Sequence, residues 1–259
     1  MSDTVEGAEQ RLINLETRLA ALEAENRSLQ RVKDVQEIQN VFSMHEYYHM
    51  AGRHGDEVNA IWATKTPGLA MEEAVLNGRY EGLEAVRGYY VEWFDRCFFG
   101  VMRQAMRELY PEVDPGPDEG VPFGVRIVHT LTTPVIEVAE DRQTAKAVWI
   151  SPGYISAPAG GKLSAMWHWD RYAIDFAHED TGWKIWHLWV GKDFSTPYEH
   201  SWVDDFFAGP NIDLRTIPDF PEPNAPSVLS YEGYNPYTRA QLVPQPPVPY
   251  RTFSETFSY

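Results

Sequence analysis

The chain has 259 residues, enough for one large domain or two small ones, and its hydrophobic content of 43% allows a real core. A formal net charge of −16 without a strong Lys/Arg run argues against nucleic acid or an anionic membrane as a partner. The single cysteine, Cys97, excludes an intrachain disulfide, and no apolar stretch approaches the roughly 20 residues of a membrane span. Because the N-terminus shows no signal-peptide pattern, we expect a cytoplasmic protein.

A narrow apolar seam runs along residues 8–32, with charged residues on the other faces. Its members alternate three and four residues apart: Leu12, Leu15, Leu19, Leu22, Asn26 and Leu29. This spacing predicts a coiled coil, in which a polar Asn in the seam fixes the register. We therefore expect residues 1–32 to join copies of the chain into a homo-oligomer, with packing on its own domain as the alternative.

Helices come first in the rest of the chain and strands follow, which predicts the α+β class with an antiparallel meander. Residues 33–208 are expected to form one domain. The Pro-rich extension over 209–259 has many aromatic residues, so we expect it to strap onto a surface, such as a neighbouring subunit. The predicted elements are, in order, helices at 34–50 and about 56–62, strands at 69–76 and 79–81, a helix at 83–109, and strands at 125–138, 144–156, 163–177 and 183–190.

The segment His45-Glu46-Tyr47-Tyr48-His49 matches the zincin pattern H-E-x-x-H on a predicted helix. Two histidines four residues apart share a helix face and could bind one metal ion. However, His54 comes one residue too early for the third ligand of the longer pattern, and no suitable Met-turn follows. We therefore interpret His45 and His49 as imidazoles of a pocket or core, and expect no metal.

The order of elements over residues 34–195 resembles the SnoaL-like branch of the nuclear transport factor 2-like superfamily. This resemblance implies a cone-shaped fold, in which a curved antiparallel sheet and N-terminal helices enclose a pocket, and in many members cofactor-free chemistry. The N-terminal coiled coil, a longer loop after the third helix and the Pro-rich tail depart from the family pattern. The resemblance is carried by the helix end Tyr47-Tyr48-His49 with residues 52–58, by Gly78-Arg79-Tyr80-Glu81-Gly82 with residues 83–86, by His129-Thr130-Leu131-Thr132-Thr133-Pro134-Val135-Ile136, and by residues 144–147 and 182–185.

The same resemblance implies the first catalytic candidates. His129 matches the strand histidine that is catalytic in dehydratases such as scytalone dehydratase. Tyr48 and His49 fall where the family places polar groups at the end of the first long helix. Tyr154 lies near the position of that dehydratase's second histidine, which is a departure from its pattern. His54 and Arg53 are interpreted as solvent or loop residues.

Alternation along the predicted strands supplies the remaining candidates. Trp167 and Trp169 share one face of a strand, and His168, Asp170 and Tyr172 share the other. The pattern leaves open which face lines the pocket: a polar set facing His187 would form a site, and a sheet face at a subunit interface is the alternative. The candidate catalytic residues are His129, His49, Tyr48, Asp170 and His187, and the candidate substrate-binding residues are His45, Trp149, Tyr154, Trp167, Trp169, Tyr172 and Trp189.

The chain also resembles the cofactor-independent diarylpropane lyases of lignin-degrading sphingomonads, which are extended SnoaL-like proteins. That resemblance implies loss of water from a phenolic diarylpropane diol, followed by loss of formaldehyde to leave a stilbene. An imidazole or tyrosine would protonate the departing hydroxyl, and a second base would take the proton of the terminal alcohol. The alternatives are a polyketide cyclase, a steroid-type dehydratase or isomerase, and a non-catalytic binding or assembly protein.

Overall fold

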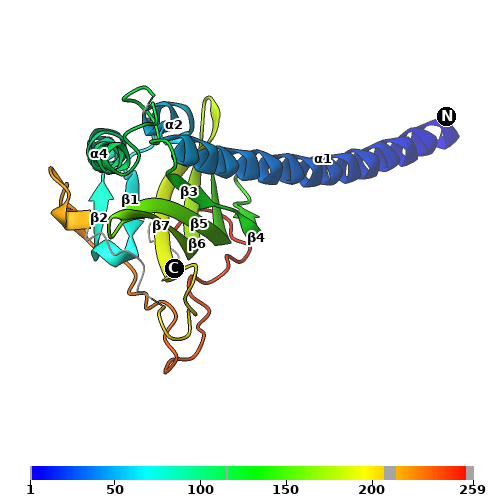
Figure 1. Cartoon of the computed structure of the whole chain (residues 1–259). Helices are drawn as coiled ribbons and strands as arrows, with labels where there is room; N and C mark the ends of the chain where they lie inside the picture. Colours follow the sequence, from blue (N-terminus) through cyan, green and yellow to red (C-terminus); the bar gives the residue numbers. More distant parts are fainter. Residues whose placement is uncertain (1, 115, 207–213, 255–259) are drawn as a thin grey trace.

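The computed structural model describes residues 2–114, 116–206 and 214–254, except for the side chains of residues 2–6. One very long helix runs out from a body made of a curved sheet and shorter helices (Figure 1), which confirms the predicted α+β class. The elements are α1 (Ser2–Ala51), α2 (His54–Ile61), β1 (Ala70–Glu73), η1 (Ala74–Leu76), β2 (Gly78–Glu81), α3 (Leu83–Arg87), η2 (Gly88–Phe98), α4 (Phe99–Leu109), β3 (Arg126–His129), β4 (Thr132–Val138), β5 (Thr144–Ala159), β6 (Lys162–Glu179), β7 (Gly182–Pro197), η3 (Leu214–Thr216) and β8 (Ala225–Pro226).

Helix α1 is continuous over 50 residues, so the predicted division into two helices near residue 33 is wrong. No proline and no glycine lies between residues 8 and 51 to interrupt it. It ends at Gly52, whose φ of 63° suits the left-handed conformation that closes a helix. There the Gly52 N–H donates to the His49 carbonyl at 3.1 Å, and the Arg53 N–H donates to the Tyr48 carbonyl at 3.0 Å. This closing turn fixes His49 at the end of α1 and reverses the chain into α2.

The sheet has the order β3-β5-β6-β7-β1-β2-β8, with β4 also paired to β5. The long strands β5, β6 and β7 pair antiparallel, as predicted, but β1 lies parallel to β7, so the sheet is mixed. Parallel neighbours need a long crossover connection, which the helices and strands between β1 and β7 provide. The strand predicted at 125–138 is two strands, because the chain turns between β3 and β4 and Thr133 adopts a φ of 49°. Likewise, the helix predicted at 83–109 is three successive helical segments, of which η2 is a π-helix.

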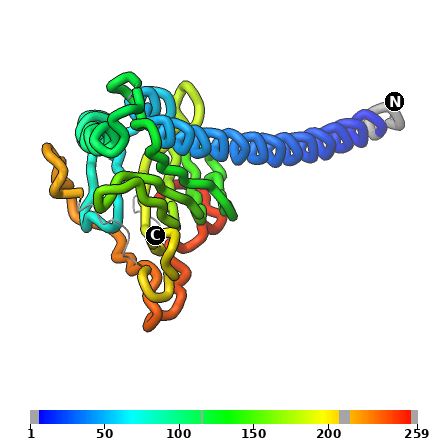
Figure 2. The backbone as a smooth tube through the Cα atoms, viewed as in Figure 1, coloured from blue at the N-terminus to red at the C-terminus, as the bar shows by residue number. Residues whose placement is uncertain are grey.

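The two faces of the sheet have different coverings. Helices α1, α2 and η2 cover the inner face, where a single large core forms around residues such as Phe42 and Ile174. The tail winds along the other side of the body (Figure 2), and its Tyr231 ring lies 5.4 Å from the Trp189 ring. The predicted strap therefore packs on the sheet of its own chain, while residues 209–213 and 255–259 lie outside the described residues. In the part of the chain described, no helix is both long and apolar enough to cross a bilayer.

Candidate functional site

A cavity of about 170 Å³ lies between the inner face of the sheet and the ends of α1 and η2. Its walls combine apolar side chains with a dense set of acid and base groups, including four histidines. The residues that strands β6 and β7 contribute to this wall are even-numbered. Asp170 pairs with Lys192 and Tyr172 with Val190, and paired residues of neighbouring strands point to the same face of the sheet. The lining residues are His45, His49, Glu73, Val75, Tyr90, Phe94, Phe98, Ile127, His129, Ile155, His168, Asp170, Tyr172, Val190, Lys192 and Leu214.

Asp170 is the electrostatic centre of this cavity. Its Oδ2 lies 3.2 Å from Nδ1 of His129 and 2.9 Å from Nε2 of His168. Burial raises the pKa of Asp170, but the two imidazoles lower it by more, so the carboxylate stays ionised. Burial also lowers the pKa of His129, yet Asp170 and, more weakly, Glu46 raise it above its usual value. The pKa of His168 is lowered, because burial outweighs the effect of Asp170. His129 is thus the imidazole of the pair that holds a proton more readily.

Glu46 approaches His129 from the α1 side. Both of its carboxylate oxygens are buried, and Tyr172 is the neighbour whose hydrogen bond acts on the pKa of this carboxyl group. Burial raises the pKa of this carboxyl group, against the opposing effects of His129 and His45. Glu46 and His129 also line a neighbouring cavity of about 290 Å³ between α1 and β3. A buried carboxyl group has room for more than one hydrogen bond, so Glu46 can also bind a molecule that enters the second cavity.

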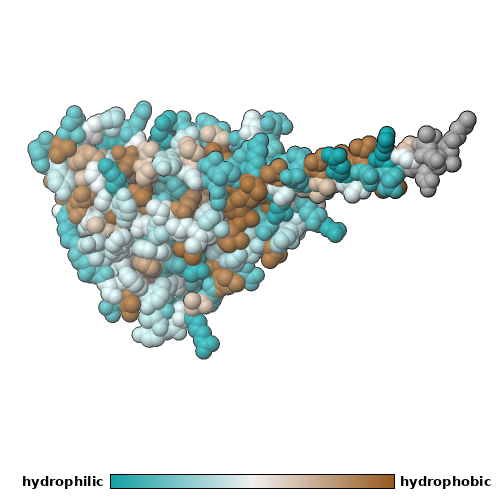
Figure 3. Space-filling view, turned by 90° about the vertical axis from the view of Figure 1, so that its right-hand side faces the viewer, coloured by the Kyte–Doolittle hydropathy of each residue, from teal (hydrophilic) through white to brown (hydrophobic). Residues whose placement is uncertain are grey.

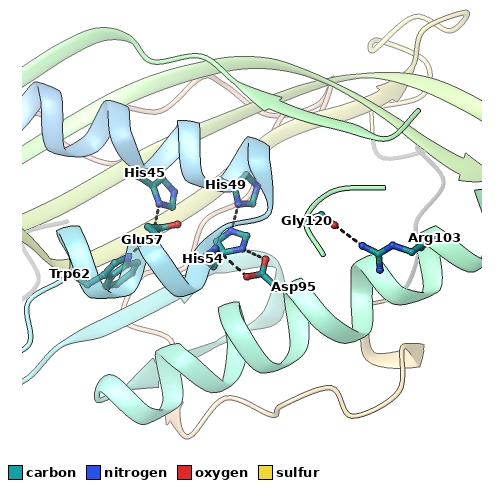
Figure 4. A network of polar contacts seen from close by, with 8 residues as sticks. All are labelled: His45, His49, His54, Glu57, Trp62, Asp95, Arg103 and Gly120. Carbon is teal, nitrogen blue, oxygen red and sulfur yellow. Dashed lines mark hydrogen bonds and ion pairs between the residues drawn. The ribbon is translucent and has the colours of Figure 1, made fainter. Parts of the chain in front are cut away.

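A chain of three side chains runs beneath the end of α1 (Figure 4). Nδ1 of His49 lies 2.8 Å from Nε2 of His54, and Nδ1 of His54 lies 2.6 Å from Oδ1 of Asp95. The backbone N–H of His54 donates to the other oxygen, Oδ2, of Asp95 at 3.1 Å. Burial, together with the neighbouring His54 and His129, lowers the pKa of His49 far below its usual value. His49 is therefore a neutral imidazole at the wall of the cavity.

A second pair stands one turn earlier on α1. Nδ1 of His45 lies 2.7 Å from Oε1 of Glu57, which also accepts a hydrogen bond from Nε1 of Trp62 at 2.6 Å. Burial lowers the pKa of His45, but Glu57 raises it by more. Burial raises the pKa of Glu57, but His45 and the other hydrogen-bond partners lower it by more. This buried ion pair fixes the His45 ring, which stacks on Phe42 with ring centroids 5.3 Å apart.

Glu73 and Lys192 bring opposite charges to the part of the wall formed by β1 and β7. The Tyr89 hydroxyl donates to Oε1 of Glu73 at 2.6 Å. Burial raises the pKa of Glu73, while the Tyr89 hydrogen bond and Lys192 oppose that rise. Lys192 is the one lysine or arginine among the residues that line the cavity. It therefore offers the cavity a cation that could face an anionic part of a bound molecule.

One group in the described part of the chain has the composition of a metal site: His129, His168 and Asp170, whose ligand atoms lie within 4.8 Å of one another. His45 and His49, which match the H-E-x-x-H pattern, are not part of this group, and their Nδ1 atoms face Glu57 and His54. Two histidines and one carboxylate could hold a divalent cation. A protonated His129 can supply the same positive charge beside Asp170, so these contacts are accounted for without an ion.

The structure brings five of the predicted site residues to the cavity. The catalytic candidates His129, His49 and Asp170 line it together, as do the substrate-binding candidates His45 and Tyr172. Two further candidates lie close by but belong to the core rather than to the cavity wall. Tyr48, a residue of α1, is partly buried against the core, and Trp149 is buried against Phe42 with ring centroids 4.6 Å apart.

The other five candidates lie on the outer face of the sheet, so they do not line this cavity. Trp167 and Trp169 alternate with the cavity residues of β6, and Tyr154 pairs with Trp167 and is 49% exposed. Trp189 lies under the tail, against Tyr231. His187 pairs with Asp175, and its Nδ1 lies 2.9 Å from an oxygen of that carboxylate. His187 therefore does not face Asp170, and its candidate catalytic role is not supported, because Asp175 and Asp170 are five positions apart on β6 and so point to opposite faces.

Sequence reasoning missed several groups of the site. His54 was expected in a loop or in solvent, but it is fully buried. Asp95, Glu57, Glu73 and Lys192 were not singled out at all. The one local signal was the turn at Gly52, which folds His54 back beneath His49. Asp95 and Glu57 reach their partners from other helices, so only the packing of those helices reveals them.

Comparisons with known proteins give one family match. The model of the SnoaL-like domain matches residues 30–188 of the chain. No curated protein matches the sequence significantly. Among solved structures, LinA is similar with a TM-score of 0.47 and 13% identity, over 68% of this chain and 96% of LinA. A hexachlorocyclohexane dehydrochlorinase LinA-type3 from Novosphingobium barchaimii LL02 has a TM-score of 0.46 and 14% identity, over 67% and 96% of the two chains. An NTF2-like protein with a cystatin-like fold from Novosphingobium aromaticivorans has a TM-score of 0.38 and 15% identity, over 67% of this chain and 87% of that protein.

Proposed function

The chain belongs to the SnoaL-like domain family, and we propose that it is a cofactor-independent lyase acting on a phenolic aromatic small molecule. The observation behind this proposal is the pairing of an acid and a base in one cavity. His129, whose pKa is raised by the Asp170 carboxylate, and the neutral His49 have ring centroids 5.5 Å apart. Eliminations need a proton donor for the leaving oxygen and a base for the proton left behind, and imidazoles suit both roles near neutral pH.

The hydrogen bonds of the relay set the tautomer of the base. The carboxylate of Asp95 can only accept, so Nδ1 of His54 carries a proton, and when this is the only proton on the ring, Nε2 of His54 accepts. Nδ1 of His49 must then donate to Nε2 of His54 across their 2.8 Å contact. This arrangement leaves Nε2 of His49 without a proton. His49 therefore presents a lone pair with which to remove a proton from substrate.

The cavity also suits an aromatic substrate. Phe94, Phe98, Tyr90 and Tyr172 supply ring faces and edges around the acid–base groups. In this proposal these rings bind the substrate, and the predicted tryptophans Trp167, Trp169 and Trp189 do not, because they lie on the outer face of the sheet. His129 also borders the second cavity, so we propose that the second ring of a two-ring substrate lies there.

The finer proposal is the dehydration and deformylation of a phenolic diarylpropane diol. The phenol first gives its proton to solvent water. His129 then gives its proton to the benzylic hydroxyl, the carbon–oxygen bond breaks, and the departure of water converts the phenolate into a neutral quinone methide. Nε2 of His49 then takes the proton of the terminal alcohol as the carbon–carbon bond breaks and formaldehyde departs. The electron pair of that bond forms the stilbene double bond and restores the aromatic ring as a phenolate, which regains its proton. Transfer of one proton from His49 to His129, through water or product, resets the site.

Incubation of the purified protein with a phenolic diarylpropane diol tests this function. We expect equimolar formaldehyde and stilbene, the latter seen by its near-ultraviolet absorbance. The same diol with its phenol methylated is the matched control, and it should not react, because it cannot form a neutral quinone methide. Absence of turnover on phenolic diols, with dehydration of a steroid-type alcohol or closure of a polyketide ring instead, would show another enzyme of the same class. Binding without any conversion would support a non-catalytic protein.

Turnover should show a bell-shaped dependence on pH. The acid limb follows protonation of His49, whose pKa lies well below the usual 6.5, so this limb should lie on the acid side of that value. The alkaline limb follows deprotonation of His129, whose pKa is raised above 6.5, so activity should fall as the pH rises through that raised value. In Asp170→Asn the carboxylate that raises the pKa of His129 is gone. Profiles of kcat/KM against pH should then show the alkaline limb at lower pH, and an unmoved limb would rule out His129 as the acid.

A further inference from the structure

The first half of α1 carries an apolar seam on which no described residue is packed. Residues 7–29 are all exposed, and the five seam leucines, from Leu12 to Leu29, keep 57–62% of their surface exposed. Figure 3 shows apolar side chains along this projecting rod, interleaved with polar ones. Helix α1 first bonds the body just beyond the seam, where Arg142 contacts Gln30 and Asp34.

The seam faces away from the body of its own chain. The same line along the helix continues through Lys33, Gln36 and Asn40, and all three are exposed. If the body covered this side of α1, these residues would be buried. Packing of the seam on its own domain is therefore excluded, and a second helix can approach along the whole line. The apolar residues of the seam end at Leu29, one residue before Gln30, where α1 first bonds the body. A partner is therefore needed only along the part of α1 that projects from the body.

Charges beside the seam indicate what that partner is. Spacing places Leu12, Leu19 and Asn26 at heptad position a, and Leu15, Leu22 and Leu29 at position d. Position g then holds Arg11, Arg18 and Glu25, and position e holds Glu16, Glu23 and Gln30. In a parallel pair in register, each g residue faces the e residue five positions later on the other helix. Arg11 would meet Glu16, and Arg18 would meet Glu23, on both sides of the pair.

We infer that residues 7–32 of two copies of this chain form a parallel, in-register, two-stranded coiled coil, which joins two bodies at its C-terminal end. An antiparallel pair would place g against g and e against e, so at the e positions glutamate would face glutamate, and the Arg–Glu pairs between g and e would be lost. Asn26 at position a supports the choice of two strands in one register, because its amide then meets the same amide of the other copy. This inference does not depend on the proposed catalytic function.

Light scattering behind size-exclusion chromatography tests the pairing on the full chain. The wild-type mass should be twice the 29.7 kDa of one chain at micromolar concentration. The double variants R11E/R18E and E16R/E23R should each dissociate at least tenfold more readily, because like charges then face each other across the seam. An equimolar mixture of the two should restore a mixed dimer, since their charges are again complementary. Arg27→Glu is the control, because position b lies away from the seam, and it should remain dimeric.

Register and direction need a separate measurement. In a Cys97→Ser background, Asn26→Cys should form an intermolecular disulfide within minutes of mild oxidation, because position 26 meets position 26 only in the parallel register. A monomeric wild type, a trimer, a mass unchanged by both double variants, or the failure of the Asn26→Cys variant to cross-link would each overturn the inference. Circular dichroism of every variant separates lost pairing from lost folding, because the body keeps its own secondary structure.

Discussion

Replacing His129 with alanine should lower kcat by about 10²–10⁴-fold, the usual contribution of a general acid. His129 is the imidazole whose pKa Asp170 raises, so its loss removes the proton donor for the leaving hydroxyl. His168 cannot replace it, because the pKa of His168 is lowered. KM should change much less than kcat, because the aromatic walls of the cavity are untouched. Steady-state kinetics on the phenolic diol, with a thermal melt of the same preparation, measures both quantities.

His200→Ala is a matched control for this variant. It also removes a histidine that is paired with an aspartate, Asp205, but the pair lies on the surface, where the imidazole side chain is 53% exposed. Its kcat should stay within about twofold of wild type, as expected for a surface substitution away from the site. If His129→Ala kept wild-type kcat, His129 would lose its role as the acid and the proposed mechanism would fail with it.

The architecture of the body followed from the order of its sequence patterns. Alternating strand residues and the Asn77–Gly78 turn are local signals, so the strands were found close to their actual positions. Local signals cannot reveal that β1 pairs parallel to β7, because that pairing depends on a crossover between distant segments. They also cannot divide a strand where the chain turns for tertiary reasons, as it does between β3 and β4.

The site shows the same limit more sharply. Alternation along β6 separated the tryptophan face from the Asp170 face, but it could not say which one is covered by helices and which by the tail. The tail lacks any periodicity, so its position over Trp189 was not readable from sequence. His129 and Asp170 were found because each stood out locally, by family pattern or by strand alternation. The relay from His49 to Asp95 was not, since its last contact joins residues 41 positions apart.

Replacing Asp95 with asparagine should lower kcat by about 10²-fold or more, although Asp95 does not line the cavity. The change preserves shape but adds a donor to the end of the relay. Because the backbone N–H of His54 donates to Oδ2 at 3.1 Å, the asparagine oxygen should take that position. Its NH₂ group then faces Nδ1 of His54 and donates to it. The proton of His54 must move to Nε2, which donates to His49 and places the proton of His49 on Nε2.

In that tautomer His49 offers no lone pair to substrate, so the base is lost although every side chain stays in place. Nitrogen-15 spectra of the imidazoles should show the switch directly: Nε2 of His49 is unprotonated in wild type and protonated in Asp95→Asn. A purely structural role would lower the melting temperature without exchanging these signals. Since His49, His54 and Asp95 act as a unit, His49→Ala combined with Asp95→Asn should be no slower than His49→Ala alone. Additive losses in the double variant would contradict the relay, because independent groups would then be acting on the reaction.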